Sequence, residues 1–115
     1  MPTLTELRNK LIVTLRLSTS QATFAACLLM EQLVPYETLC AALDCNDDAV
    51  KVGAWRLNHS KAFLSRKLAT RNAWGLGYYF DPATREKIFR ELDYVDPLKA
   101  NIAHSADDNE RVAAQ

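Results

Sequence analysis

The chain has 115 residues, of which 49% are apolar, and its 14 basic and 14 acidic side chains give a formal net charge of zero. A chain of this size is expected to form one domain with a small core, and its ordinary apolar fraction argues against wholesale disorder. No apolar run approaches the roughly 20 residues that a membrane span needs, and no signal-peptide pattern opens the chain, so we expect a cytoplasmic protein without a membrane partner.

Leucines at helical spacing open the chain and predict an amphipathic helix over residues 3–15. They are Leu4, Leu7, Leu11 and Leu15. We treat residues 1–16 as an N-terminal helical segment. Its leucines either pack on the domain or pair with a second copy of the chain, and we expect a homodimer.

A second helix is expected to begin at Ser18, because Ser18 and Gln21 have the spacing of a capping box. It should run to about Gln32, where Val34-Pro35 ends it. Pro35 also opens a further helix, since a missing N–H costs nothing in a first turn. A turn at residues 44–48 separates that helix from the next one.

The helix predicted from Asp48 to about Leu64 has two different sides. The side that should face the core carries Val50, Ala54 and Leu57, and the opposite side carries Lys51, Val52, Trp55, Arg56 and His59, with Asn58 at the margin. The opposite side is either simply solvated or contacts DNA, where a valine can touch thymine methyls and an arginine or asparagine can bond base edges or phosphates. We favour DNA contact, because an exposed valine and tryptophan are poor choices for solvent.

The segment from Asn72 to Phe80 holds two of the three glycines, Gly75 and Gly77, beside several aromatic residues. Glycine adopts a positive φ without steric cost, so this spacing predicts a tight hairpin in which Gly77 has a positive φ. Its strands are predicted at residues 67–73 and 78–80. Trp74 should point outward at the tip of the hairpin, and the competing prediction places it in the core.

Asp81 and Pro82 predict the start of a last helix over residues 82–93, and we treat residues 81–95 as a C-terminal helical segment. Its apolar stripe consists of Ile88, Phe89 and Leu92. This stripe, like the N-terminal leucines, either packs on the domain or pairs between subunits. Residues 96–115 are predicted to be a disordered acidic tail, because large apolar residues become rare there.

The zero net charge hides an asymmetry between two parts of the chain. Residues 46–80 contain six Lys or Arg against two Asp, a net charge of +4, whereas residues 91–115 contain six acidic residues against two basic ones, a net charge of −4. A basic middle segment is compatible with phosphate binding even in a chain without net charge.

Enzymatic motifs are missing from the sequence. The three cysteines, Cys27, Cys40 and Cys45, form an odd set without C-x-x-C spacing and are expected to be small buried hydrophobes rather than metal ligands. His59 is the one plausible base in the folded region, and no residue pairs with it by spacing. Phosphate-cradling glycine loops and H-E-x-x-H motifs are absent. The sequence therefore predicts no enzyme, no cofactor and no metal site.

Four motifs in order carry a resemblance to a known family. They are L-S-T-S-Q-A, V-P-Y-E-T-L, A-V-K-V-G-A-W-R-L and N-A-W-G-L-G-Y-Y-F. The stretch from Leu17 to Phe80 that contains them resembles the winged-helix effector domain of OmpR-like bacterial response regulators and, more closely, the stand-alone winged-helix proteins of phages and mobile elements. The resemblance implies base and phosphate contacts from Lys51, Val52, Trp55, Arg56 and Asn58, and a backbone contact from Asn72.

The sequence departs from this family at several positions. Trp55, Asn58 and His59 stand where the family often has Arg or Lys, and Trp74 stands where a minor-groove arginine is usual. A helix is predicted in place of the family's N-terminal strands, and no receiver domain is expected. Control by phosphorylation is therefore not expected.

The fold class that we predict is mainly α with a small β-hairpin, a winged helix-turn-helix domain over residues 17–80 with added helices at both ends. The expected function is sequence-specific binding of double-stranded DNA as a transcriptional regulator, with contacts to the transcription machinery. The alternative is a winged-helix protein-interaction module, an antiactivator or adaptor that does not bind DNA. The expected DNA-binding residues are Lys51, Val52, Trp55, Arg56, Asn58, His59, Arg71, Asn72 and Trp74.

Overall fold

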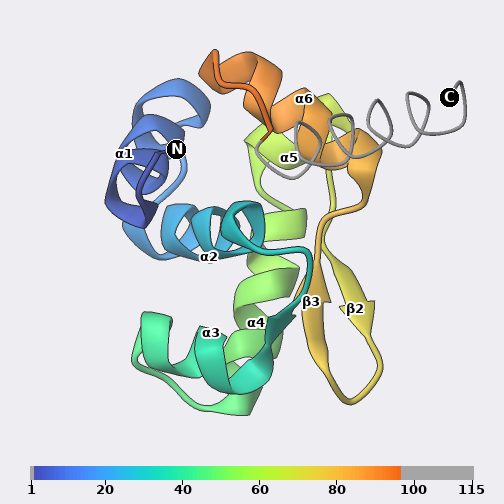
Figure 1. Ribbon diagram of the computed structural model, residues 1–115. Helices are drawn as coiled ribbons and strands as arrows, with labels where there is room; N and C mark the ends of the chain where they lie inside the picture. Colours follow the sequence, from blue (N-terminus) through green and yellow to red (C-terminus); the bar gives the residue numbers. More distant parts are fainter. Residues whose placement is uncertain (1, 97–115) are drawn as a thin grey trace, which may run out of the picture.

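Six helices and a small three-stranded antiparallel sheet make up residues 2–96, the part of the chain that the computed structural model describes (Figure 1). In chain order the elements are α1 (Leu4–Leu15), α2 (Thr19–Met30), β1 (Val34–Pro35), α3 (Tyr36–Leu43), α4 (Asp47–Asn58), α5 (Lys61–Arg66), β2 (Arg71–Ala73), β3 (Gly77–Tyr79) and α6 (Pro82–Leu92). The expectation of a mainly helical domain with a small β element is confirmed.

The leucines of α1 are part of the core of this single chain. Leu7, Leu11 and Leu15 are at most 4% exposed, and α1 packs mainly on α2 and also on α6. The apolar stripe of α6, predicted at Ile88, Phe89 and Leu92, is buried as well. The two predicted alternatives for these apolar stripes were packing on the domain and pairing between subunits. Packing on the domain is confirmed, and a homodimer would need another surface.

We expect Leu11→Ala to lower the free energy of unfolding by about 2–5 kcal/mol, because Leu11 is fully buried and its truncation leaves a cavity. Val13→Ala on the same helix is the matched control. Val13 is 78% exposed, and its replacement should change stability by less than about 0.5 kcal/mol. Urea unfolding followed by circular dichroism measures both values. A midpoint that rises with protein concentration would contradict this result and indicate an interface between subunits.

The predicted helix caps are present. Ser18 and Gln21 form both hydrogen bonds of a capping box at the start of α2. The carboxylate of Asp81 accepts from the Thr84 N–H at the start of α6, and this bond, aided by Arg71, lowers the pKa of Asp81. Because the pKa is lowered in the folded state, the stability that Asp81 contributes is present above its unfolded pKa and is lost as the pH falls.

The prediction of one long helix from Asp48 to about Leu64 is wrong. The chain forms α4 and α5 instead, separated at residues 59–60. Ser60 causes the break, because its hydroxyl accepts a hydrogen bond from the Phe63 N–H and caps a new helix.

The first predicted strand also begins later, at Arg71 rather than at residue 67. Lys67 ends α5 in the left-handed conformation, with φ of 57°. The Leu68 N–H then bonds back to the Phe63 carbonyl, which is a Schellman ending. Residues 67–70 therefore end α5 and connect it to β2.

The hairpin predicted at the two glycines is present, and a third strand joins it. β3 lies between β2 and β1, with Gly77 opposite both Ala73 and Pro35. Of these two glycines, only Gly75 has a positive φ, at 73°. Gly77 is needed for a different reason, because a Cβ there would overlap the carbonyl oxygen of Val34 on β1. The expectation that Gly77 supplies a positive φ is therefore wrong.

A buried arginine joins α6 to the C-terminal end of α2. Arg85 is 5% exposed and donates to the carbonyl oxygens of Leu28 (2.6 Å), Leu29 (2.8 Å) and Glu31 (3.2 Å). Its Nε and Nη2 also form a two-pronged ion pair with the carboxylate of Asp96, both at 3.0 Å. The guanidinium thus satisfies carbonyl groups that the end of a helix leaves free.

Asp96 is the last described residue and is only 7% exposed. The disordered tail predicted for residues 96–115 otherwise lies outside the described residues. Within the described part of the chain, no helix has the length and hydropathy required to cross a membrane.

Candidate functional site

Helix α4 lies against the core along one side and is open to solvent along the other. Val50, Ala54 and Leu57 are at most 4% exposed, as predicted. We call the exposed residues Lys51, Val52, Trp55, Arg56 and His59 the outer face of α4. It combines two cations with apolar and aromatic surface, since Val52 is 47% and Trp55 61% exposed.

Trp55 and His59 form a stacked pair on this outer face. Their ring centroids are 4.1 Å apart, with 22° between the ring planes. The Nδ1 atom of His59 lies 2.8 Å from the carbonyl oxygen of Trp55, so in the neutral ring this nitrogen carries the proton. The imidazole therefore lies flat against the indole, and Nε2 remains the accepting nitrogen.

Asn58 has a role within the fold. Its side-chain oxygen accepts from the Thr70 N–H at 2.7 Å, which ties the end of α4 to the chain entering β2. A DNA contact from Asn58 stays a prediction, and its amide NH₂ rather than this oxygen would have to make it.

The hairpin carries Arg71, Asn72 and Trp74, with Trp74 at its tip. Trp74 is 94% exposed and the neighbouring Leu76 is 62% exposed, so the competing prediction of a buried Trp74 is wrong. The side chain of Arg71 is 61% exposed and lies 3.5 Å from the Asp81 carboxylate. Such an exposed pair is worth little energetically, so it leaves Arg71 available to another anion.

The hairpin is fixed to the start of α3. The Tyr36 hydroxyl donates to the Asn72 side-chain oxygen at 2.8 Å, and the Tyr36 N–H donates to the Leu76 carbonyl at 3.2 Å. The Tyr78 ring packs edge-on against both Tyr36 and Phe24, with centroids 5.6 and 5.7 Å apart. The position of the hairpin relative to α4 is therefore set by the core. No sequence motif indicated the role of Tyr36.

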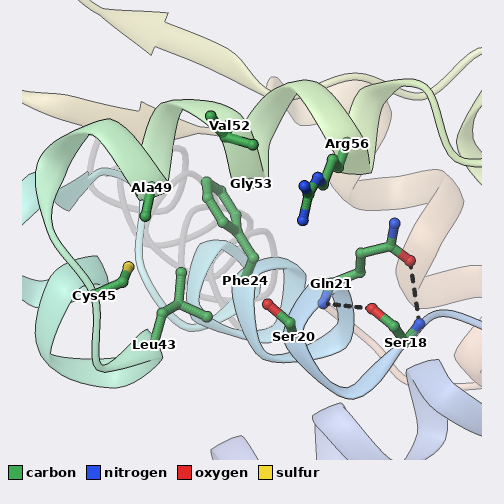
Figure 2. A pocket seen from close by; sticks show the side chains of 10 residues that line it. All are labelled: Ser18, Ser20, Gln21, Phe24, Leu43, Cys45, Ala49, Val52, Gly53 and Arg56. Atoms are coloured by element: carbon green, nitrogen blue, oxygen red, sulfur yellow. Dashed lines mark hydrogen bonds between the residues drawn. The ribbon is translucent and has the colours of Figure 1, made fainter.

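A groove of about 560 Å³ separates α4 from the first turn of α2 (Figure 2). Its floor includes the ring of Phe24, for which Gly53 leaves room, because the position of a Cβ on Gly53 is 3.4 Å from that ring. Arg56 extends from α4 toward Gln21 on the opposite wall, as Figure 2 shows. Arg56 therefore belongs both to the outer face of α4 and to this groove, which we call the α2–α4 groove.

The thiols of Cys27 and Cys40 are poor nucleophiles. Desolvation raises the pKa of Cys27, and desolvation together with a hydrogen bond to Asp47 raises the pKa of Cys40 to about 11. Both are therefore protonated at neutral pH. Within residues 2–96, no three His, Cys, Asp or Glu side chains are grouped so that they could hold a metal ion.

Comparison of the chain with protein-family models, with curated proteins and with solved structures found no match.

Proposed function

We propose that residues 17–80 form a winged helix-turn-helix domain that binds double-stranded DNA and acts as a small transcriptional regulator. In this proposal α4 enters the major groove with its outer face toward the bases. The hairpin β2–β3 lies against the adjacent backbone. The observation that carries the proposal is the outer face itself, where Lys51, Val52, Trp55 and Arg56 are exposed on a helix whose other side is buried.

The order and connection of the elements support this proposal. Helices α3 and α4 pack together and are joined by residues 44–46, as in a helix-turn-helix. β1 precedes α3 and pairs with β3, so the hairpin stands beside α4 (Figure 1). Asp44, at the C-cap of α3, has a φ of 53°, which turns the chain sharply toward α4.

The charges at the outer face also support binding to phosphate groups. Lys51 and Arg56 form no ion pair within residues 2–96, so binding an anion does not require a protein contact to be broken. Asp47 and Asp48 carry the opposite charge to these cations and lie in the first turn of α4, where the helix dipole stabilises carboxylates.

Arg56→Ala is the direct test of the proposal. We expect the affinity for a duplex to fall by about 1–3 kcal/mol, the value of a lost arginine contact, with no change in thermal stability. Fluorescence anisotropy with genomic duplex fragments at two salt concentrations measures this change, because phosphate-driven binding must weaken as salt rises. Lys87→Ala is the control, since Lys87 is an exposed cation on α6. Equal affinities for Arg56→Ala and wild type would contradict the proposed orientation of α4.

A second candidate function is a protein-interaction module that does not bind DNA. Four large apolar side chains favour it, because Val52, Trp55, Trp74 and Leu76 are between 47% and 94% exposed. The zero net charge points in the same direction. Exposed apolar side chains that form a contiguous patch commonly mark a protein contact.

Trp74→Ala, measured beside the wild type, tests whether the hairpin contacts the duplex. Trp74 is 94% exposed, so its truncation should leave the melting temperature unchanged. If the hairpin touches the duplex, anisotropy should show affinity falling about fivefold or more, as expected for a base or backbone contact of about 1 kcal/mol or more. Wild-type protein that binds no fragment even at low salt would favour the interaction module instead.

A further inference from the structure

A second groove, of about 510 Å³, adjoins the α2–α4 groove. It lies between the end of α1 and the start of α5, and Gln21 lines both grooves. We call it the α1–α5 groove. Its walls carry Arg16, Lys61 and Arg66, together with the hydroxyls of Ser60 and Ser65.

The two grooves together are lined by four cations, and no Asp or Glu is among the described residues that line them. Arg66 is already engaged, since its Nε lies 2.6 Å from the Glu91 carboxylate. Arg16, Arg56 and Lys61 are exposed and form no ion pair within residues 2–96. Three uncompensated cations therefore follow one continuous path from α4 to α1.

The hairpin and the α2 wall of these grooves lie on opposite sides of α4. Figure 1 shows the hairpin on one side of α4 and α1 and α2 on the other, and Figure 2 shows the strands and α2 separated by α4. A helix in the major groove lies between the two phosphate backbones that border the groove. In the proposed placement, the hairpin lies against one of these two backbones.

We propose that Arg16 and Lys61, continuing from Arg56, bind the phosphate backbone on the side of the major groove away from the hairpin. This inference rests on the proposed DNA-binding function and extends its footprint to α1 and α5. The three cations are spread along two adjoining open grooves, so they suit a linear polyanion better than one enclosed phosphate. Contacts of this kind position a protein on the duplex without reading its sequence.

The test compares the double variant R16A/K61A with wild type and with K87A. The probe is a fluorescein-labelled duplex of mixed sequence, alongside a genomic fragment that the wild type binds, and anisotropy is measured from 50 to 500 mM salt. Each lost phosphate contact should lower the slope of log K against log salt by about 0.9, so the double variant should lose about 2. Affinity should fall by the same factor for both duplexes. K87A should retain the wild-type slope.

Three results would overturn the inference. The first is an unchanged slope in R16A/K61A while Arg56→Ala still weakens binding, which leaves the proposed function intact. The second is an equal loss in K87A, which would indicate overall charge rather than these two side chains. The third is a wild type that binds no duplex at any salt, which removes the proposed function and this inference together. Circular dichroism melting of R16A/K61A should match that of wild type, because both residues are exposed.

Discussion

Replacing Gly77 by valine is expected to destabilise the domain by about 3 kcal/mol or more, because overpacking at this position meets rigid backbone. A Cβ at Gly77 would overlap the Val34 carbonyl oxygen and crowd Pro35, so β1 must separate from β3. Even Gly77→Ala meets the same atoms. For a domain of this size, the loss lowers the melting temperature by about 12 °C or more.

Gly75→Ala is the matched control for the Gly77 variants. Gly75 has a φ of 73°, but no atom beyond its two chain neighbours lies within 4 Å of the position that a Cβ would take. The cost should therefore be that of a left-handed residue alone, about 1 kcal/mol. Thermal melts followed by circular dichroism measure the melting temperature of each variant. A Gly77→Ala variant as stable as Gly75→Ala would contradict the close approach of β1 and β3.

Replacing Arg85 by leucine should cost about 3–5 kcal/mol of folding free energy, the range for breaking one partner of a buried ion pair. Asp96 loses a two-pronged contact, and the carbonyl oxygens of Leu28 and Leu29 lose their donor. Arg85→Lys should recover only part of this loss, because one ammonium group cannot supply the same set of donors. Chemical unfolding measures the free energy of unfolding of the wild type, Arg85→Leu and Arg85→Lys.

Two further variants show which contact of Arg85 matters. Arg90→Ala, on the same helix, removes an exposed ion pair with Glu86 and should cost less than about 1 kcal/mol. Arg85→Leu combined with Asp96→Leu removes both charges of the buried pair. If the carbonyl groups at the end of α2 are the main partners of Arg85, this double variant stays well below wild type. Full recovery in the double variant would instead assign the effect to the ion pair alone.

Local signals in the sequence predicted most of the helix starts and the buried sides. The capping box at Ser18 and the helix start at Asp81-Pro82 depend on contacts between residues a few positions apart, so the local sequence is enough to predict them. The split between α4 and α5 was also local, at Ser60, but apolar periodicity continued across it and concealed the break.

The long-range contacts could not be predicted from one sequence. β1 is only two residues long and includes a proline, so it has no alternating pattern, and it exists because β3 lies beside it. Arg85 looks in sequence like a surface cation on an amphipathic helix. Its burial follows from the end of α2, which is 54 or more residues earlier in the chain.

The candidate site was predicted in part. The exposure of Trp55 and the outward Trp74 followed from helical and hairpin spacing. The bond between Asn58 and Thr70 was not foreseeable, because it depends on where β2 begins. The α1–α5 groove was missed as well, since Arg16 and Lys61 are 45 residues apart and only the packed fold brings them to one groove.

Both tryptophans of the chain lie outside its core, Trp55 at 61% and Trp74 at 94% exposure. Their intrinsic fluorescence should therefore change little when the core melts, in contrast to most small domains, where a buried indole reports unfolding. The same emission becomes a direct reporter of docking. Stacking of bases on either indole should quench it, whereas burial against an apolar protein surface should shift it to shorter wavelength. Because Trp55 lies on α4 and Trp74 on the hairpin, single-tryptophan variants would show which element a partner touches.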